Sequence, residues 1–139
     1  MKKHLLFLLL LGALVGACSS GPPRSVGPVE VSEGDLHVRM ESVPSPPREG
    51  ENVTFTITAR DAYSGEPLQD VEVRPVIDMY MATSRMLVPF DTIRSTGPGE
   101  VQVQAFLEHV GTLKISVGVN RDGVITPVRL PDVPIQPAQ

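Results

Sequence analysis

Three methionines and one histidine in the second half of the chain are the residues whose types suit metal chemistry. Met79 and Met81 are two positions apart, so on a β-strand their thioethers would lie on one face. Thioether sulfur is a soft ligand suited to Cu(I), and Met86 and His109 could complete a site from nearby turns. The alternative is structural, because methionine often fills irregular gaps in a hydrophobic core. The sequence favours this second interpretation.

The other polar residues predict no catalytic centre. His37 and His109 are far apart in the sequence and have no cysteine near them, so they do not form a zinc motif. His37 alternates with the apolar residues on either side of it and shares its strand face with Arg39 and Glu41, which predicts a solvated face. The serines lie in no nucleophile elbow, and no calcium loop of the D-x-D-x-D-G type is present. We therefore expect a protein without catalytic activity.

The single cysteine, Cys18, follows a short hydrophobic segment. Lys2 and Lys3 precede the apolar run 5–15, which is shorter than the roughly 20 residues that a membrane-spanning helix needs. This is the pattern of a secretory signal peptide, predicted over residues 1–17.

The segment Val15-Gly16-Ala17-Cys18 further resembles a bacterial lipobox. The resemblance implies that the peptide is cut before Cys18, and that this residue is then acylated on its sulfur, as by palmitate, and on its new amino group. The alternative is an ordinary secreted protein. Ser19 stands where an aspartate would signal retention in the inner membrane, so the usual rule favours the outer membrane of the cell envelope, on its periplasmic face.

Length and composition indicate one folded domain with a flexible start. The chain has 139 residues, of which 41% are hydrophobic and 20% charged. Its net charge is −4, and it becomes −6 once Lys2 and Lys3 are removed with the signal peptide. No basic stretch remains, so nucleic-acid binding is not expected. Residues 18–34 are rich in small residues and prolines, which predicts a tether.

The stretch Glu51 to Asp61 predicts the strand around which the domain is organised. Its apolar residues alternate strictly with its polar residues, so each set occupies one face of a strand. The inward set is Val53, Phe55, Ile57 and Ala59. The outward set contains Thr54, Thr56 and Thr58, which predicts either a solvent-facing surface or a surface for a partner.

Further strands are expected on both sides of this one, around 36–41, 71–78, 101–107, 113–119 and 124–130, and the irregular segments 85–89 and 91–94 could add short strands. Asp122-Gly123 is a strong hairpin signal. Pro75 places its strand at a sheet edge or at a bulge. About seven short strands without a helical period predict an all-β protein, an antiparallel immunoglobulin-like β-sandwich over residues 35–130. A barrel is the second choice, and residues 131–139 are expected to form a Pro-rich tail.

Several short segments resemble the FixH/YtkA-like family of small, membrane-attached, immunoglobulin-like domains. The matching segments are 50–53, 65–68, 79–86, 97–104 and 111–115. The resemblance implies the sandwich fold and an association with copper handling or cytochrome oxidase assembly.

Two functions follow from these patterns. The first is a lipid-anchored envelope module without catalytic activity, bound to the membrane through Cys18 and contacting another envelope protein. The second is a metallochaperone-like protein that binds copper through Met79, Met81, Met86 and His109.

Overall fold

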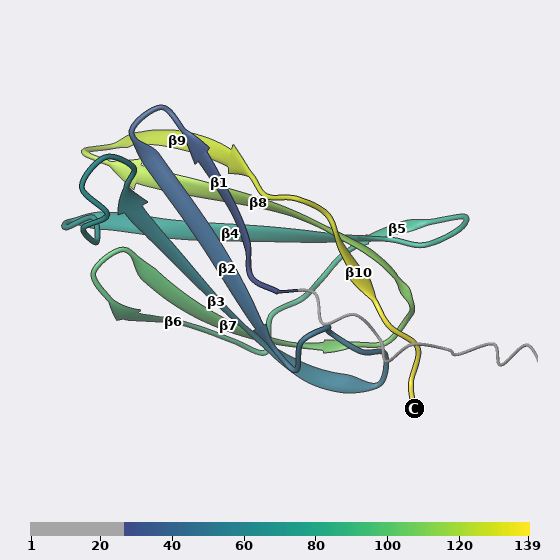
Figure 1. Cartoon of the computed structure of the whole chain (residues 1–139). Helices are drawn as coiled ribbons and strands as arrows, with labels where there is room; N and C mark the ends of the chain where they lie inside the picture. Colours follow the sequence, from purple (N-terminus) through teal and green to yellow (C-terminus); the bar gives the residue numbers. More distant parts are fainter. Residues whose placement is uncertain (1–26) are drawn as a thin grey trace, which may run out of the picture.

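The protein is described here by a computed structural model that covers residues 27–139, and these residues form two stacked layers of β-strands (Figure 1). No helix within residues 27–139 is long and apolar enough to cross a membrane. Cys18 and the predicted signal peptide lie outside the described residues. The strands are β1 Val29–Glu33, β2 Leu36–Val43, β3 Glu51–Asp61, β4 Val71–Tyr80, β5 Arg85–Leu87, β6 Thr92–Gly97, β7 Glu100–Leu107, β8 Gly111–Arg121, β9 Val124–Arg129 and β10 Val133–Ile135.

Two antiparallel sheets make the layers. The β3 sheet has the order β1-β2-β3-β7-β6. The β4 sheet has the order β10-β8-β4-β5, and β9 pairs with the part of β8 that β10 leaves uncovered. The predicted antiparallel β-sandwich is therefore confirmed, and the barrel is wrong because the two sheets do not join into one.

The core lies between the two inner faces and is built by alternation. On β3, the inward residues Val53, Phe55, Ile57 and Ala59 are at most 1% exposed, as predicted. Every second residue is likewise buried in the core on β7 from Val101 to Leu107, on β4 from Val73 to Met79 and on β8 from Leu113 to Val119. No charged or polar residue within the described part of the chain is buried. This core therefore depends on burial of apolar surface, which is the main force stabilising a folded domain.

The predicted boundaries of the domain were too narrow at both ends. Residues 29–33 were expected to belong to a tether, but they form β1, which pairs with β2 and packs Val29 and Val31 against the core. Residues 133–135 were expected in a loose tail, but they form β10, where Val133 and Ile135 are buried. In both segments, apolar residues at every second position outweigh the neighbouring prolines, which edge strands tolerate.

Pro75 lies in the middle of β4, and the pairing of that strand explains how it is accommodated. β4 pairs with β8 along its whole length, but β5 covers only Asp78 to Tyr80 on the other side. The Val88 N–H donates to the Ile77 carbonyl at 2.8 Å, so Ile77 directs its backbone groups away from β8. The backbone groups of successive residues in a strand point to opposite sides, so residue 75, two positions before Ile77, also directs its backbone groups away from β8. Its missing N–H therefore costs no ladder bond. The prediction of an edge or a bulge holds only locally, because β4 lies between β8 and β5 in the sheet but has no strand beside Pro75 on that side.

Candidate functional site

The outer face of the β3 sheet carries a continuous polar surface, formed where β2, β3 and β7 lie side by side. The outward residues of β3 predicted from the sequence, Thr54, Thr56 and Thr58, are half-buried there. The register places each of them between one residue of β2 and one of β7. Thr58, for example, lies between Arg39 and Glu100. The surface therefore joins two consecutive strands, β2 and β3, to β7, which is distant from them in the sequence.

Side-chain hydrogen bonds run across this surface in two ladders. In the first, Gln102 Nε2 donates to Thr56 Oγ1 at 3.4 Å, and Arg94 donates to Gln102 Oε1 at 3.3 Å. The second ladder has the same form and joins Thr92, Gln104 and Thr54. Such cross-strand pairs hold polar side chains in fixed positions on a sheet.

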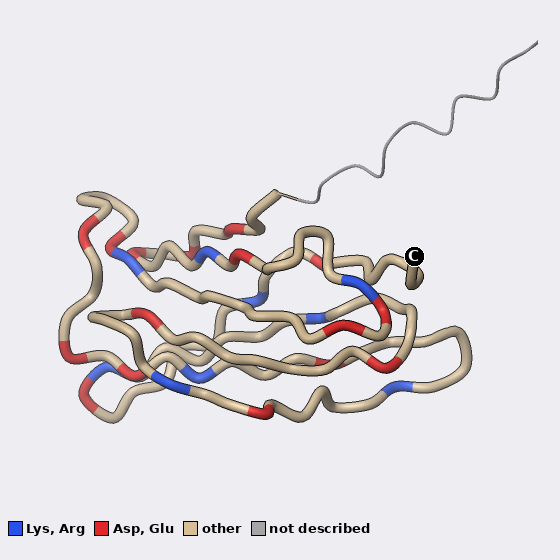
Figure 2. Tube along the Cα trace, turned by 90° about the horizontal axis from the view of Figure 1, so that it is seen from below, with Lys and Arg blue, Asp and Glu red and all other residues tan. Residues whose placement is uncertain are grey.

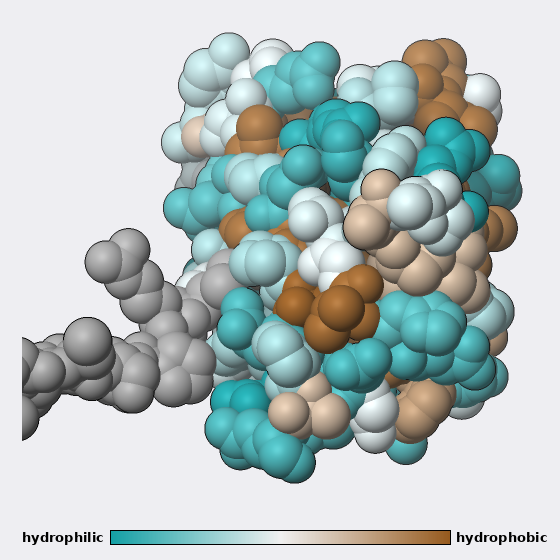
Figure 3. Space-filling view, turned by 90° about the vertical axis from the view of Figure 1, so that its right-hand side faces the viewer, coloured by the Kyte–Doolittle hydropathy of each residue, from teal (hydrophilic) through white to brown (hydrophobic). Residues whose placement is uncertain are grey.

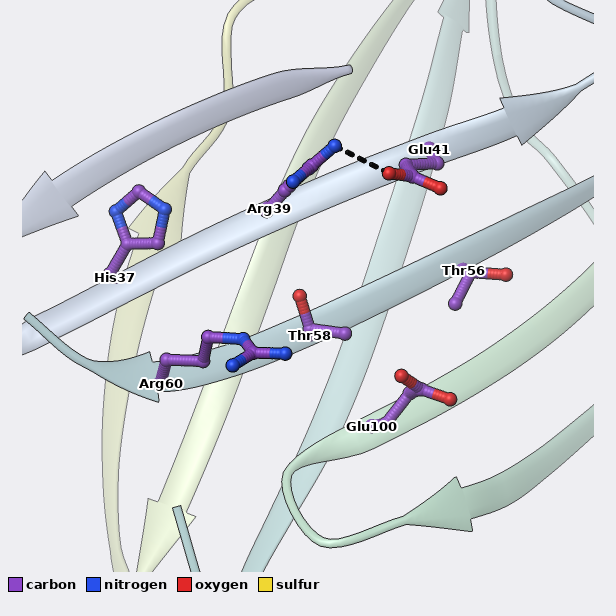
Figure 4. Close-up of a pocket in the computed structure, with 7 residues that line it drawn as sticks. All are labelled: His37, Arg39, Glu41, Thr56, Thr58, Arg60 and Glu100. Carbon is purple, nitrogen blue, oxygen red and sulfur yellow. Dashed lines mark hydrogen bonds and ion pairs between the residues drawn. The ribbon is translucent and has the colours of Figure 1, made fainter. Parts of the chain in front are cut away.

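Beside the ladders, the surface is hollowed, with a volume of about 270 Å³. Figure 4 shows His37 and Arg60 at one end of this polar hollow, and Glu41 and Glu100 toward the other end. The complete lining is His37, Arg39 and Glu41 from β2, Thr56, Thr58 and Arg60 from β3, and Glu100 from β7.

Hydrogen bonds and close ionic contacts orient the side chains that line the polar hollow. Arg39 donates to Glu41 Oε1 at 2.6 Å across the rim. His37 Nδ1 lies 2.9 Å from the Ser32 hydroxyl, and His37 Nε2 lies 3.6 Å from a Glu30 oxygen.

At the two ends of the polar hollow, Arg60 donates to the Gly65 carbonyl at 3.0 Å, and the Thr96 hydroxyl donates to Glu100 at 2.7 Å. The hollow therefore presents positive and negative groups in a set order on a rigid sheet.

An ion pair next to the polar hollow ties the two sheets together. Both terminal nitrogens of Arg121, at the end of β8, donate to the carboxylate of Asp35 at 2.9 and 3.0 Å. This hydrogen bond lowers the pKa of Asp35 and raises the pKa of Arg121. Asp61, next to Arg60, accepts the backbone N–H groups of Ser64 and Tyr63, and these bonds lower its pKa.

The predicted metal ligands are only partly brought together. Met79 is 1% exposed in the core, and its register partner across β4 and β5 is Met86. Both line a second, smaller hollow of about 160 Å³, with Glu108, Asp91 and Phe106 among its other residues.

Met81 and His109 do not line this second hollow. Met81 lies one position beyond β4, where its sulfur is 3.9 Å from the Ser84 hydroxyl, and His109 Nε2 is 4.0 Å from Glu108. This end of the sandwich, which carries β5, is mostly polar with small separate apolar patches (Figure 3). Within the described residues, no group of three or more His, Cys, Asp or Glu side chains is placed to hold a metal ion.

Sequence reasoning missed most of the polar hollow. It assigned the threonines of β3 to a surface, but it read His37, Arg39 and Glu41 only as a solvated face and gave no role to Arg60 or Glu100. One pattern in the sequence could have indicated this surface: glutamines alternate with apolar residues on β7 in the same way as threonines do on β3. The pairing of these two strands, which are about 50 residues apart, is not visible in a single sequence.

The fold belongs to the class of small antiparallel β-sandwiches. No protein-family model matches the chain, and no curated protein matches it. Among solved structures, the chain resembles a DUF4426 family protein from Pseudomonas aeruginosa PAO1, with a TM-score of 0.56 and 15% identity over 81% of this chain and 98% of that one. A second similar structure is FetP from uropathogenic E. coli strain F11, with a TM-score of 0.48 and 10% identity over 78% and 95%.

At these identities the DUF4426 protein supports the fold alone. The resemblance to the FixH/YtkA-like family therefore stays a prediction, although the sandwich that it implies is confirmed.

Proposed function

We propose that the protein is a lipid-anchored binding module of the bacterial cell envelope that has no catalytic activity. In this proposal it contacts another envelope protein through the polar outer face of its β3 sheet. The observation that carries the proposal is the polar hollow, because its side chains are already hydrogen-bonded in place on a rigid sheet.

A preformed polar surface suits recognition for two reasons. Side chains that are already fixed lose little conformational entropy when a partner binds, so more of the contact energy appears as affinity. An ordered arrangement of charges also selects a partner with the complementary arrangement. His37 and Arg60 at one end, and Glu41 and Glu100 toward the other, provide such an arrangement (Figure 4).

The anchor in this proposal is Cys18. Because β1 begins at Val29, residues 18–28 would join the acylated cysteine to the first strand. At roughly 3.4 Å per residue, this segment can span at most about 37 Å. The domain would therefore work close to the membrane that holds it.

The anchor is tested by changing Cys18→Ser in the full chain and comparing it with Ser19→Ala as a matched control. We expect the control to fractionate with membranes and to incorporate labelled palmitate, and we expect the Cys18 variant to do neither. Membrane association and labelling of both variants alike would reject the lipid anchor.

The binding face is tested with a photo-crosslinking amino acid placed at Thr56, within the polar hollow, or at Ser116, exposed on the outer face of the β4 sheet. In intact cells we expect one adduct of defined mass from position 56, and we expect Arg60→Ala to lower its yield. Equal adducts from both positions, or none from position 56, would reject this face.

Copper binding remains a second candidate because of one observation: Met79 and Met86 face each other across β4 and β5 and line the same hollow. Two thioethers at such a place suit Cu(I). The test is a Cu(I) competition titration of Met86→Leu, with Met40→Leu as the control because Met40 is a buried methionine on β2. Copper binding predicts at least about tenfold weaker affinity for the first variant alone, and equal affinities would remove this candidate.

A further inference from the structure

One side of the sandwich lacks a strand. Among residues 27–139, only β5 pairs with the edge of β4 that faces away from β8, and it stops at Asp78. The edge from Val71 to Val76 therefore has no strand beside it. By the alternation described for Ile77, the backbone groups of Val71 and Val73 point outward from this edge, together with the Pro75 carbonyl.

The opposite layer extends beyond this edge. β6 is the outermost strand of the β3 sheet, and its Ile93 is in register with the fully buried Val103 of β7. Ile93 therefore belongs to the inner face of the sheet, yet its side chain is 57% exposed. It is exposed because the β4 sheet has no strand above it.

The open edge and the overhanging strand enclose a groove, which we call the strand slot. It has a volume of about 250 Å³. At one end the connection from β5 to β6 crosses between the sheets, where Val88 is bonded to Ile77. The slot is lined by Val71, Glu72, Val73, Ile93, Arg94, Ser95, Glu100 and Val101.

We propose that the strand slot receives an extended segment of the partner protein, which adds a strand to β4. Unpaired N–H and C=O groups along an edge recognise another extended backbone, and side pockets then select its alternate side chains. The inward side chains of the guest would meet Val73, Ile93 and Val101, so they should be apolar. This inference rests on the proposed binding function and adds a second contact surface to it.

The size and charge of the slot define the segment further. The edge from Val71 to Val76 is about 20 Å long at roughly 3.3 Å per residue, so it fits about six residues. The lining of the slot has two acidic residues, Glu72 and Glu100, and one basic residue, Arg94. The described residues as a whole hold nine Lys and Arg against sixteen Asp and Glu, which are spread over the domain (Figure 2). The outward side chains of the guest should therefore be neutral or basic.

A second copy of the domain fits the slot less well. If two β4 edges paired in the antiparallel way about a twofold axis, each β4 would lie above the β6 of the other copy. Each β4 already packs against the β7 of its own sandwich. The β6 of one copy and the β7 of the other copy would therefore have to occupy the same space. A single extended segment meets no such obstacle.

The test uses the full-length chain in mild detergent and a capped synthetic peptide, Lys-Val-Thr-Val-Lys-Val-Thr, followed by isothermal titration. The key variant is Val73→Pro, which removes an outward N–H without breaking the ladder to β8. Its matched control is Val73→Ala, which loses side-chain volume but keeps that N–H. We expect Val73→Pro to bind about three- to tenfold more weakly than Val73→Ala, which is the effect of one hydrogen bond.

Two further measurements keep the test decisive if Val73→Pro fails to fold. Pro75→Val adds an outward N–H and should bind the peptide more tightly than the unmodified protein. A peptide N-methylated at its valines keeps the side chains but cannot donate to β4, and it should not bind.

Each remaining outcome overturns the proposal. These outcomes are no binding of the parent peptide at about 1 mM, equal binding of the two Val73 variants, or undiminished binding of the N-methylated peptide. Self-association of the protein that Val73→Pro abolishes would assign the slot to a second copy. Crosslinking from position 56 reports on the outer face of the β3 sheet, so failure of the slot and failure of the binding function are separable.

Discussion

Gly99, in the turn between β6 and β7, offers the sharpest test of the structure. Its backbone has φ +63°, a left-handed conformation that costs a residue with a Cβ about 1–2 kcal/mol. A Cβ added there would lie 2.5 Å from the backbone oxygen of Ala59, and no real Cβ is found so close. Gly99→Ala must therefore push the turn away from β3.

The displacement would also disturb two backbone hydrogen bonds around Ala59. Its N–H donates to the Gly99 carbonyl at 2.7 Å, and its carbonyl accepts from Leu68 N–H at 3.2 Å. Each such bond contributes about 0.5–1.5 kcal/mol. With the backbone strain, Gly99→Ala should lower the free energy of unfolding by about 2–5 kcal/mol, a large part of the 5–15 kcal/mol typical of a domain.

Urea unfolding followed by far-UV circular dichroism is the suitable assay, because the chain has no tryptophan. Gly97→Ala is the matched control at the end of β6, next to the turn, since Gly97 has no positive φ and open space around its Cβ position. The control should change the free energy of unfolding by less than about 0.5 kcal/mol. A Gly99 variant as stable as the control would refute the close approach of this turn to β3.

Two other perturbations have defined outcomes. Phe55→Ala should lower the free energy of unfolding by about 3–5 kcal/mol because Phe55 is fully buried, whereas Phe106→Ala, at a position 44% exposed, should lower it by less than about 1 kcal/mol in the same urea assay. The pKa of Asp35 is lowered from its usual 3.8 by Arg121, so this pair stabilises the fold above that pH and the contribution is lost as pH falls through the lowered pKa. As the pH is lowered below about 4, the free energy of unfolding should therefore fall less for Asp35→Asn than for the unmodified protein. Parallel curves of this free energy against pH for the two proteins would contradict the role of the pair.

The elements that the sequence predicted well are those that local pattern controls. Strict alternation from Val53 to Ala59 identified the central strand and its inward face. The Asp122-Gly123 pair predicted the turn between β8 and β9, where both residues have the positive φ that a two-residue hairpin loop requires. In each case the deciding interaction is between residues close in sequence.

The elements that it predicted poorly depend on distant partners. β1 and β10 are short, and they are stable because β2 and β8 present open edges to them. The polar hollow requires the pairing of β3 with β7, which no local pattern specifies. The methionines were expected on a shared strand face, but β4 ends at Tyr80, so Met79 packs in the core and Met81 already lies in the following turn.

The proline in the middle of β4 also limits how far an intermolecular sheet can grow. An exposed strand edge is a template on which other chains can stack, and long uninterrupted edges promote fibrils. On β4, Pro75 withholds one donor in the stretch between Val71 and Ile77, so any ladder that a neighbouring chain forms along this edge lacks one hydrogen bond at that position. One missing donor costs a short guest strand little, whereas it repeats in every layer of a growing stack, so Pro75 works against aggregation through this edge.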